Sequence, residues 1–276
     1  MKGSKADIKA QLQRSILLMQ GFKPATNDID VNTGLYFIQN SFPNSRFPIG
    51  VTHEFFCNNI EEVSASCAFV SGIISTFIKK EALFIWISSF QNIFPPALQL
   101  FGIHPEKIIF LHLKKEKEKL WAMEEALKCD AISFVIGEIN ELSFTESRRL
   151  QLITEKSKVT GFIIRRNPKN LSTASVTRWN IKPARSQFEN FNQTLLGTDN
   201  FLVENFKVKS IHDGKKNYPD FVSKGMPGIG FPKWDVTLLK VRNGKPGNWK
   251  IQWRNKKFEL IDQPGLIIPQ EQRKIG

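Results

Sequence analysis

Charged side chains follow two short apolar segments in the middle of the sequence. Residues 131–136 read Ala-Ile-Ser-Phe-Val-Ile and lead to Gly137 and Glu138, while the apolar residues 159–164 lead to Arg165 and Arg166. Short runs rich in Ile, Val and Phe are typical of strands that are covered on both faces of a parallel sheet. Ligands bind beyond the carboxyl ends of such strands. We therefore expect Glu138 and the arginine pair to share one edge of the sheet.

The connection between residues 55 and 66 has the position of a phosphate-binding loop but lacks its chemistry. Such a loop uses glycine to bring backbone N–H groups close to phosphates, and lysine to neutralise their charge. Here it contains neither residue type, and it places Glu61 and Glu62 at the expected start of a helix. Carboxylates suit a helix N-terminus, so we expect them to take the place of phosphate. The sequence predicts no nucleotide hydrolysis, and Glu138 is expected to cap its strand rather than to bind magnesium.

Neither the histidines nor the cysteines indicate a metal site or a nucleophilic enzyme. The four histidines lie far apart, and the three cysteines, Cys57, Cys67 and Cys129, have no paired spacing. Each cysteine has apolar neighbours, which predicts reduced core residues in a cytosolic protein. We expect no metal and no cofactor.

Strand-like and helix-like segments alternate along the chain, which predicts an α/β fold with a mostly parallel central sheet flanked by helices. The lysine-rich run 114–119 is expected to be a solvated helix face. Glycines at 244 and 247 predict a turn between two late strands, and hence a C-terminal β-hairpin. Strands are expected at 50–57, 83–87, 107–113, 131–138, 159–164, 175–181, 234–242 and 249–253, and helices at 4–20, 60–78, 95–101, 115–128 and 141–152.

Three regions are expected: an N-terminal helix and loop over 1–48, a core over 49–262, and a tail over 263–276. Within the core, residues 185–230 are rich in Asn, Gln, Lys, Gly and Pro, which predicts an insertion or long loop. The first helix places Ile8, Leu12 and Ile16 at helical spacing and is expected to pack on the core or on a partner. No segment approaches the length of a membrane span, so we expect a cytoplasmic protein without membrane contact.

The chain is strongly basic. Its 276 residues carry 39 Lys and Arg against 26 Asp and Glu, a formal net charge of +13. This balance is compatible with nucleic acid, acidic lipid or an acidic protein as partner, and also with a solvated basic surface that has no specific partner.

Seven blocks of sequence carry a resemblance to a known family, namely residues 50–55, 85–89, 94–98, 120–129, 137–152, 177–179 and 230–247. They resemble the ImuA family of RecA-like accessory proteins of error-prone translesion DNA synthesis. The resemblance covers residues 50–182 and 228–258, and implies a RecA-like core without the ATPase loop. It also implies a role in SOS-induced DNA repair and mutagenesis, with a Y-family polymerase-like protein and an error-prone replicative-type polymerase as partners.

The resemblance implies a site for single-stranded DNA. In a RecA-like core this ligand is contacted by the loops after the strands that end here at Glu138 and Arg166, namely residues 140–145 and 167–174. Basic residues near these loops are expected to neutralise phosphates, with Trp179 as a stacking surface. The basic residues are Arg165, Arg166, Lys169, Arg178, Arg148 and Arg149. For Arg148 and Arg149 the alternative is a surface ion pair with Glu141, with Glu146 or with acids of a partner.

The predicted hairpin adds a second candidate contact. Lys240 and Arg242 alternate with an apolar residue, so both are expected on one face of the strand. In RecA-like ATPases basic residues at this position reach the nucleotide of the adjacent subunit. Here the receiving loop offers Glu61 and Glu62 instead, so we expect a contact with another copy or a RecA-like neighbour. The alternative is that Lys240 and Arg242 only solvate an exposed hairpin.

Three function classes follow from these observations. We favour a non-catalytic accessory protein, located in the cytoplasm with the nucleoid. The second class is a cryptic RecA-like ATPase, and the third is a protein-binding regulator of a RecA filament or of cell division.

Overall fold

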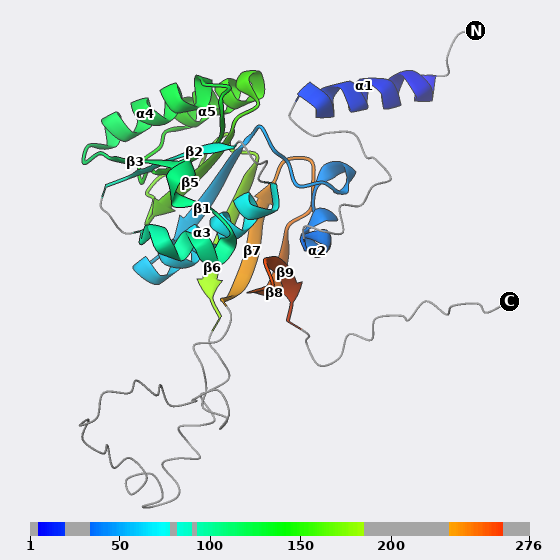
Figure 1. Cartoon of the computed structure of the whole chain (residues 1–276). Helices are drawn as coiled ribbons and strands as arrows, with labels where there is room; N and C mark the ends of the chain where they lie inside the picture. The colour runs from blue at the N-terminus through cyan, green and yellow to red at the C-terminus, as the bar shows by residue number, and fades with distance from the viewer. Residues whose placement is uncertain (1–4, 20–33, 78–81, 90–92, 185–231, 262–276) are drawn as a thin grey trace, which may run out of the picture.

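The computed structural model describes residues 5–19, 34–77, 82–89, 93–184 and 232–261 (Figure 1). The expected insertion at 185–230 and the tail at 263–276 lie outside these residues. The described strands form one nine-stranded sheet in the order β3-β2-β4-β5-β1-β6-β7-β8-β9.

The sheet is parallel through its first six strands in spatial order and antiparallel at its C-terminal end. Neighbouring strands from β3 to β6 pair in parallel, whereas β6 to β9 pair as an antiparallel meander. The expected α/β class, with a mostly parallel sheet and a C-terminal hairpin, is confirmed, and the RecA-like nature of the core stays a prediction. The strands are β1 (Thr52–Cys57), β2 (Leu83–Ser88), β3 (Ile108–His112), β4 (Ile132–Glu138), β5 (Thr160–Arg166), β6 (Thr177–Pro183), β7 (Lys233–Val241), β8 (Gly247–Arg254) and β9 (Lys257–Leu260).

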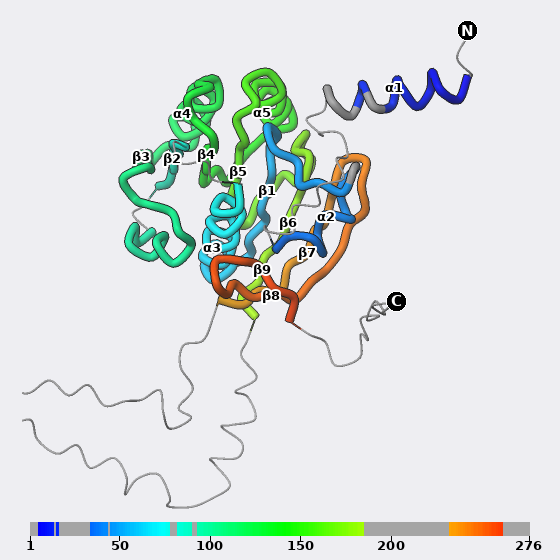
Figure 2. The backbone as a smooth tube through the Cα atoms, turned by 45° about the vertical axis from the view of Figure 1, so that its right-hand side comes forward, coloured from blue at the N-terminus to red at the C-terminus, as the bar shows by residue number. Residues whose placement is uncertain are grey.

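Helices cover both faces of the parallel part (Figure 2). On one face α3 (Ile60–Phe77) packs Phe69 and Ile73 into the largest apolar core. On the other face α4 (Glu116–Lys128) and α5 (Phe144–Ser157) contribute Met123 and Leu150 to the second core. The side chains of β5 alternate between these cores, as expected for a strand buried on both faces.

Short helices connect these elements. They are α2 (Tyr36–Gln39) and the 3₁₀ helices η2 (Pro43–Ser45), η3 (Pro95–Phe101) and η4 (Pro105–Lys107). The helix expected at 95–101 is therefore a 3₁₀ helix, and it ends at Gly102, whose φ of +75° suits glycine.

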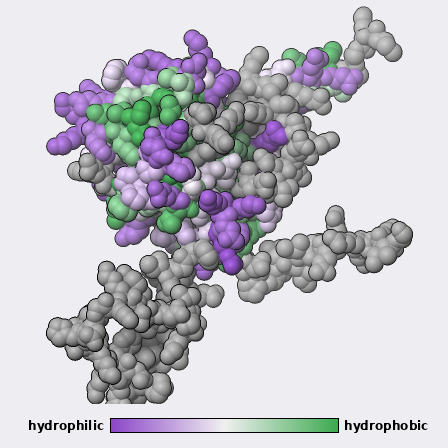
Figure 3. Space-filling view, viewed as in Figure 1, coloured by the Kyte–Doolittle hydropathy of each residue, from purple (hydrophilic) through white to green (hydrophobic). Residues whose placement is uncertain are grey.

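Helix α1 (Lys5–Met19) forms as expected, but its apolar stripe is not covered by the described residues. Ile8, Leu12 and Ile16 are 50–58% exposed, and hydrophobic side chains are visible on this helix beside hydrophilic ones (Figure 3). Of the two alternatives, packing on the core is therefore not seen.

Four expectations about individual segments need correction. Lys119 is fully buried, not solvated, because α4 turns it toward the ends of the strands. Trp179 is also fully buried, since β6 points it into the core beside Phe55, so it offers no stacking surface. Cys129 is exposed, just past the end of α4. Finally, one described helix, Ile60–Phe77, is long and apolar enough to cross a membrane by length and composition, although it is packed against the sheet.

Candidate functional site

Glu138 and Arg166 share one edge of the sheet, as expected. Both line a small pocket of about 80 Å³ at the carboxyl ends of β4 and β5, together with Lys119 and Ser89. The Lys119 ammonium donates to Ser89 Oγ at 2.9 Å and to Glu116 Oε1 at 2.5 Å. Arg165, the neighbour of Arg166 on β5, points to the opposite face, because successive strand residues alternate.

Glu138 does not make the expected hydrogen bond to the next turn through Oε1, which is buried and has no partner among the described residues. Burial raises the pKa of its carboxyl, while the charge of Lys119, the neighbouring indole of Trp86 and the charge of Arg166 act in the opposite direction. The Trp86 N–H lies beside this carboxyl without the geometry of a hydrogen bond. The turn itself is held by Glu116, whose Oε2 accepts from the Asn140 N–H at 3.0 Å.

The loop between β1 and α3 carries its own anion. Glu62 is buried, and its carboxylate accepts from the backbone N–H of Asn58 at 2.8 Å and from Asn180 Nδ2 at 2.9 Å. Asn59 Oδ1 in turn accepts from the Glu62 N–H at 2.8 Å, which caps the start of α3. A phosphate loop offers its backbone N–H groups to a ligand; here Glu62 takes one of them. Glu61, by contrast, is exposed.

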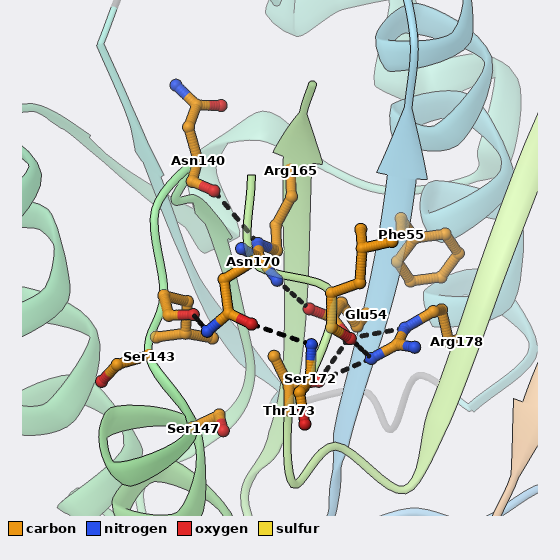
Figure 4. Close-up of polar contacts among 12 residues, drawn as sticks. Glu54, Phe55, Asn140, Ser143, Ser147, Arg165, Asn170, Ser172, Thr173 and Arg178 are labelled. Atoms are coloured by element: carbon orange, nitrogen blue, oxygen red, sulfur yellow. Dashed lines mark hydrogen bonds and ion pairs between the residues drawn. The ribbon is translucent and has the colours of Figure 1, made fainter. Parts of the chain in front are cut away.

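A buried carboxylate organises the opposite face of β1. Glu54 is fully buried and accepts hydrogen bonds from Arg165 at 2.6 Å, from Arg178 at 3.1 Å and from the hydroxyl of Thr173 at 2.6 Å (Figure 4). The guanidinium groups of both arginines lie over the ring of Phe56, at 5.5 and 4.5 Å from its centroid. Cation–π contacts of this kind add to the ion pairs.

The two expected DNA loops lie side by side and are tied together. Asn140 receives hydrogen bonds from the other loop's strand, from Arg165 Nε to its carbonyl and from the Arg166 N–H to its side chain, both at 3.1 Å. Asn170 Nδ2 donates to the Leu142 carbonyl at 3.3 Å (Figure 4). The start of α5 completes the connection, since Ser147 Oγ accepts from the Ala174 N–H at 2.9 Å.

Lys240 and Arg242 lie on one face, as expected, and contact the second of these loops. Lys240 Nζ donates to the Thr173 carbonyl at 3.0 Å, and Arg242 donates to the Ala174 carbonyl at 2.7 Å. Arg242 also lies 3.6 Å from a carboxylate oxygen of Glu155. The contact of Lys240 and Arg242 with Glu61 and Glu62 of a neighbour stays a prediction.

The six candidate DNA-binding residues separate into exposed and engaged groups. Arg166 and Lys169 are exposed, and the Arg148 side chain is 45% exposed. Arg165 is fully buried against Glu54, and Arg178 is 16% exposed beside it. The direct contact of all six with DNA stays a prediction, but the burial of Arg165 leaves it no free surface in this conformation.

The α5 arginines form ion pairs within the chain, but not with Glu141 or Glu146 as expected; a contact with acids of a partner stays a prediction. Arg149 Nε donates to Glu124 on α4 at 2.6 Å, and Arg148 lies 4.0 Å from Glu155 further along α5. Glu146 is engaged elsewhere, because it forms a capping box with Ser143 that also lowers the pKa of its carboxyl. No group of three or more potential metal ligands occurs among the described residues.

Sequence reasoning missed Glu54 and Lys119. Glu54 directly precedes Phe55, Phe56 and Cys57 in a predicted core strand. A charge at such a position requires a buried partner, so the sequence did contain a signal for it. The burial of Lys119 could not be predicted from the sequence, because it depends on a contact with Ser89, thirty residues earlier.

Comparison with known proteins finds relatives of one name. No family model matches. Protein ImuA of Caulobacter vibrioides, from strain NA1000 / CB15N and from strain ATCC 19089 / CIP 103742 / CB 15, is 27% identical over 228 residues, which covers 78% of this chain and 80% of the relative. This similarity supports the resemblance to the ImuA family. Among solved structures, SulA from Pseudomonas aeruginosa matches 42% of this chain and 98% of its own length, at 16% identity and a TM-score of 0.36.

Proposed function

We propose that this chain is a non-catalytic RecA-like accessory protein of SOS-induced mutagenesis. It acts in translesion DNA synthesis with a Y-family polymerase-like protein and an error-prone replicative-type polymerase, in the cytoplasm with the nucleoid. The observation that carries this proposal is the similarity to Protein ImuA along 78% of the chain.

The loop before α3 supports the non-catalytic part of the proposal. The Glu62 carboxylate accepts the Asn58 backbone N–H at 2.8 Å, and the segment has neither glycine nor lysine. A nucleotide phosphate at this place meets negative charge instead of a cradle of donors, which disfavours its binding.

Exposed basic residues support contact with single-stranded DNA. Arg166 is the last residue of β5 and Lys169 lies on the second loop, and both are exposed. Lysine and arginine at such a loop contribute sequence-independent affinity by displacing counterions from phosphates.

The test is genetic. A strain that lacks this chain and produces it from a plasmid is exposed to ultraviolet light, and drug-resistant mutants are counted. We expect the deletion to lower the induced mutation frequency, and the wild-type chain and Glu138→Ala to restore it equally, because no hydrolysis is involved. An unchanged frequency in the deletion strain contradicts the role in mutagenesis. Loss of function in a folded Glu138→Ala protein contradicts the non-catalytic assignment.

The polymerase partnership is tested separately by co-purification. Tagged chain is expected to retain the Y-family polymerase-like protein of the same organism, whereas retention of a RecA filament or a cell-division protein alone favours the regulator alternative.

A further inference from the structure

Four basic side chains come together beside the second loop, linked by shared acceptors. Thr173 accepts from Arg178 through its hydroxyl and from Lys240 through its carbonyl, both at 3.0 Å. Glu155 lies between Arg242 at 3.6 Å and Arg148 at 4.0 Å. The bond from Arg242 to the Ala174 carbonyl joins the two halves. We call Arg148, Arg178, Lys240 and Arg242 the four-cation cluster.

The charges of this cluster are not balanced by its neighbours. Among the described residues two carboxylates face it, Glu54 and Glu155, and Glu54 is already bound by the buried Arg165. Five described cations therefore share two described anions. Burial and the charge of Arg178 lower the pKa of Lys240, while the charge of Glu54 raises it. Burial lowers the pKa of Arg242, the charge of Glu155 raises it and the charge of Arg148 lowers it.

Like charges held together reduce the stability of the fold, and a polyanion relieves that repulsion. The cluster remains accessible, since the side chains of Arg148, Arg242 and Arg178 are 45%, 24% and 16% exposed. Two of its internal acceptors, the carbonyls of Thr173 and Ala174, are neutral, so they orient the cations without cancelling their charge.

We infer that the four-cation cluster is a binding surface for the phosphates of single-stranded nucleic acid, continuing the contact of the second loop across β6 and β7. This assigns Lys240 and Arg242 to the nucleic-acid surface of their own chain rather than to a neighbouring subunit. The inference rests on the contact with single-stranded DNA in the proposed function. Because all of the groups recognise phosphate, the surface binds without regard to base sequence.

The experiment measures the affinity of the full chain for an oligothymidylate over a range of salt concentrations. The test variant combines Lys240→Gln and Arg242→Gln. We expect the slope of log affinity against log salt to flatten by about 1.4, because each phosphate of a single strand that a cation no longer neutralises accounts for about 0.7. Arg148→Gln alone is expected to flatten the slope by about 0.7.

The control is Lys128→Gln. It removes the same charge from an exposed position on α4, where Lys128 is paired with Glu125 and belongs to neither the cluster nor the candidate DNA-binding residues. We expect this variant to keep the wild-type slope. Variants that keep the cation, Lys240→Arg with Arg242→Lys, are expected to keep it too.

Each outcome has a distinct meaning. An unchanged slope in the folded double variant overturns the inference, and so does an equal flattening by Lys128→Gln, which indicates only a general charge effect. If the double variant fails to fold, Arg148→Gln decides in its place, because Arg148 lies on the helix surface. If the wild type itself shows no salt-dependent binding, the DNA contact of the proposed function fails as a whole.

Discussion

At the scale of single residues, Glu54 is the side chain whose replacement is expected to destabilise the fold most. Its carboxylate is the only described anion within hydrogen-bonding distance of the buried Arg165. A buried ion pair adds little compared with an apolar replacement, but removal of one partner leaves a desolvated charge. Glu54 is therefore required for the stability of the fold.

Glu54→Gln is expected to lower the free energy of unfolding by about 3–5 kcal/mol, because Arg165 is left buried and unpaired. Urea unfolding measures this. Glu125→Gln is the control, since its pair with Lys128 is exposed on α4 and is worth at most about 1 kcal/mol. Equal destabilisation of the two variants contradicts the assigned role.

His53, the neighbour of Glu54 on β1, is expected to make the stability of the fold sensitive to acid. Burial lowers the pKa of this histidine from 6.5 to about 3. Between these values the unfolded chain binds a proton that the folded chain does not, so stability falls as the pH drops through this window. Replacement by Gln, which does not titrate, is expected to flatten the pH dependence of unfolding between pH 6.5 and about 3. An unaltered profile means that other groups control acid unfolding.

At the scale of elements, the predicted strands and helices nearly all form, and the differences have local causes. Residues 141–143 do not join α5, because Ser143 caps the helix; the Ser-x-x-Glu spacing that signals this was legible in the sequence. Strand β9 was not predicted, because its four residues become a strand only by pairing with β8. The candidate site was the least predictable part, since each partner of Arg148 and Arg149 depends on how α4 and α5 pack.

Ser143→Ala is expected to destabilise the fold by about 1 kcal/mol through loss of the cap of α5. Thermal unfolding monitors this change. Thr145→Ala, in the same exposed first turn, is the control and is expected to remain within about 0.5 kcal/mol of the wild type. A Ser143 variant as stable as the Thr145 variant shows that the cap does not limit stability.

At the scale of the whole molecule, the parallel half of the sheet has the pocket of Glu138 and the loops with exposed cations at one edge. The antiparallel half adds the basic side chains of Lys240 and Arg242 beside these loops. The order of the strands brings residues 54, 178 and 240 to one face, although they are distant in the sequence. This grouping depends on the topology of the sheet and could not be predicted from sequence spacing alone.

Mg-ATP is expected to leave the melting temperature of the chain unchanged. A ligand that binds only the native state stabilises it by about 2.7 kcal/mol at a hundredfold excess over its dissociation constant, which is readily seen. Thermal unfolding with millimolar Mg-ATP tests this, with Glu138→Ala as the comparison. An upward shift in the wild type that disappears in the variant favours the ATPase alternative.

The carboxylate of Glu62 bears on how the activity of this protein is regulated. In a nucleotide-dependent protein the corresponding loop binds and releases nucleotide in turn, so each molecule alternates between a nucleotide-bound and a nucleotide-free state. Here the anion is covalently part of the chain and is present from the moment of folding. On the proposed function, the contribution of this protein in a damaged cell is therefore set by how many copies are made and destroyed, and not by the state of each copy.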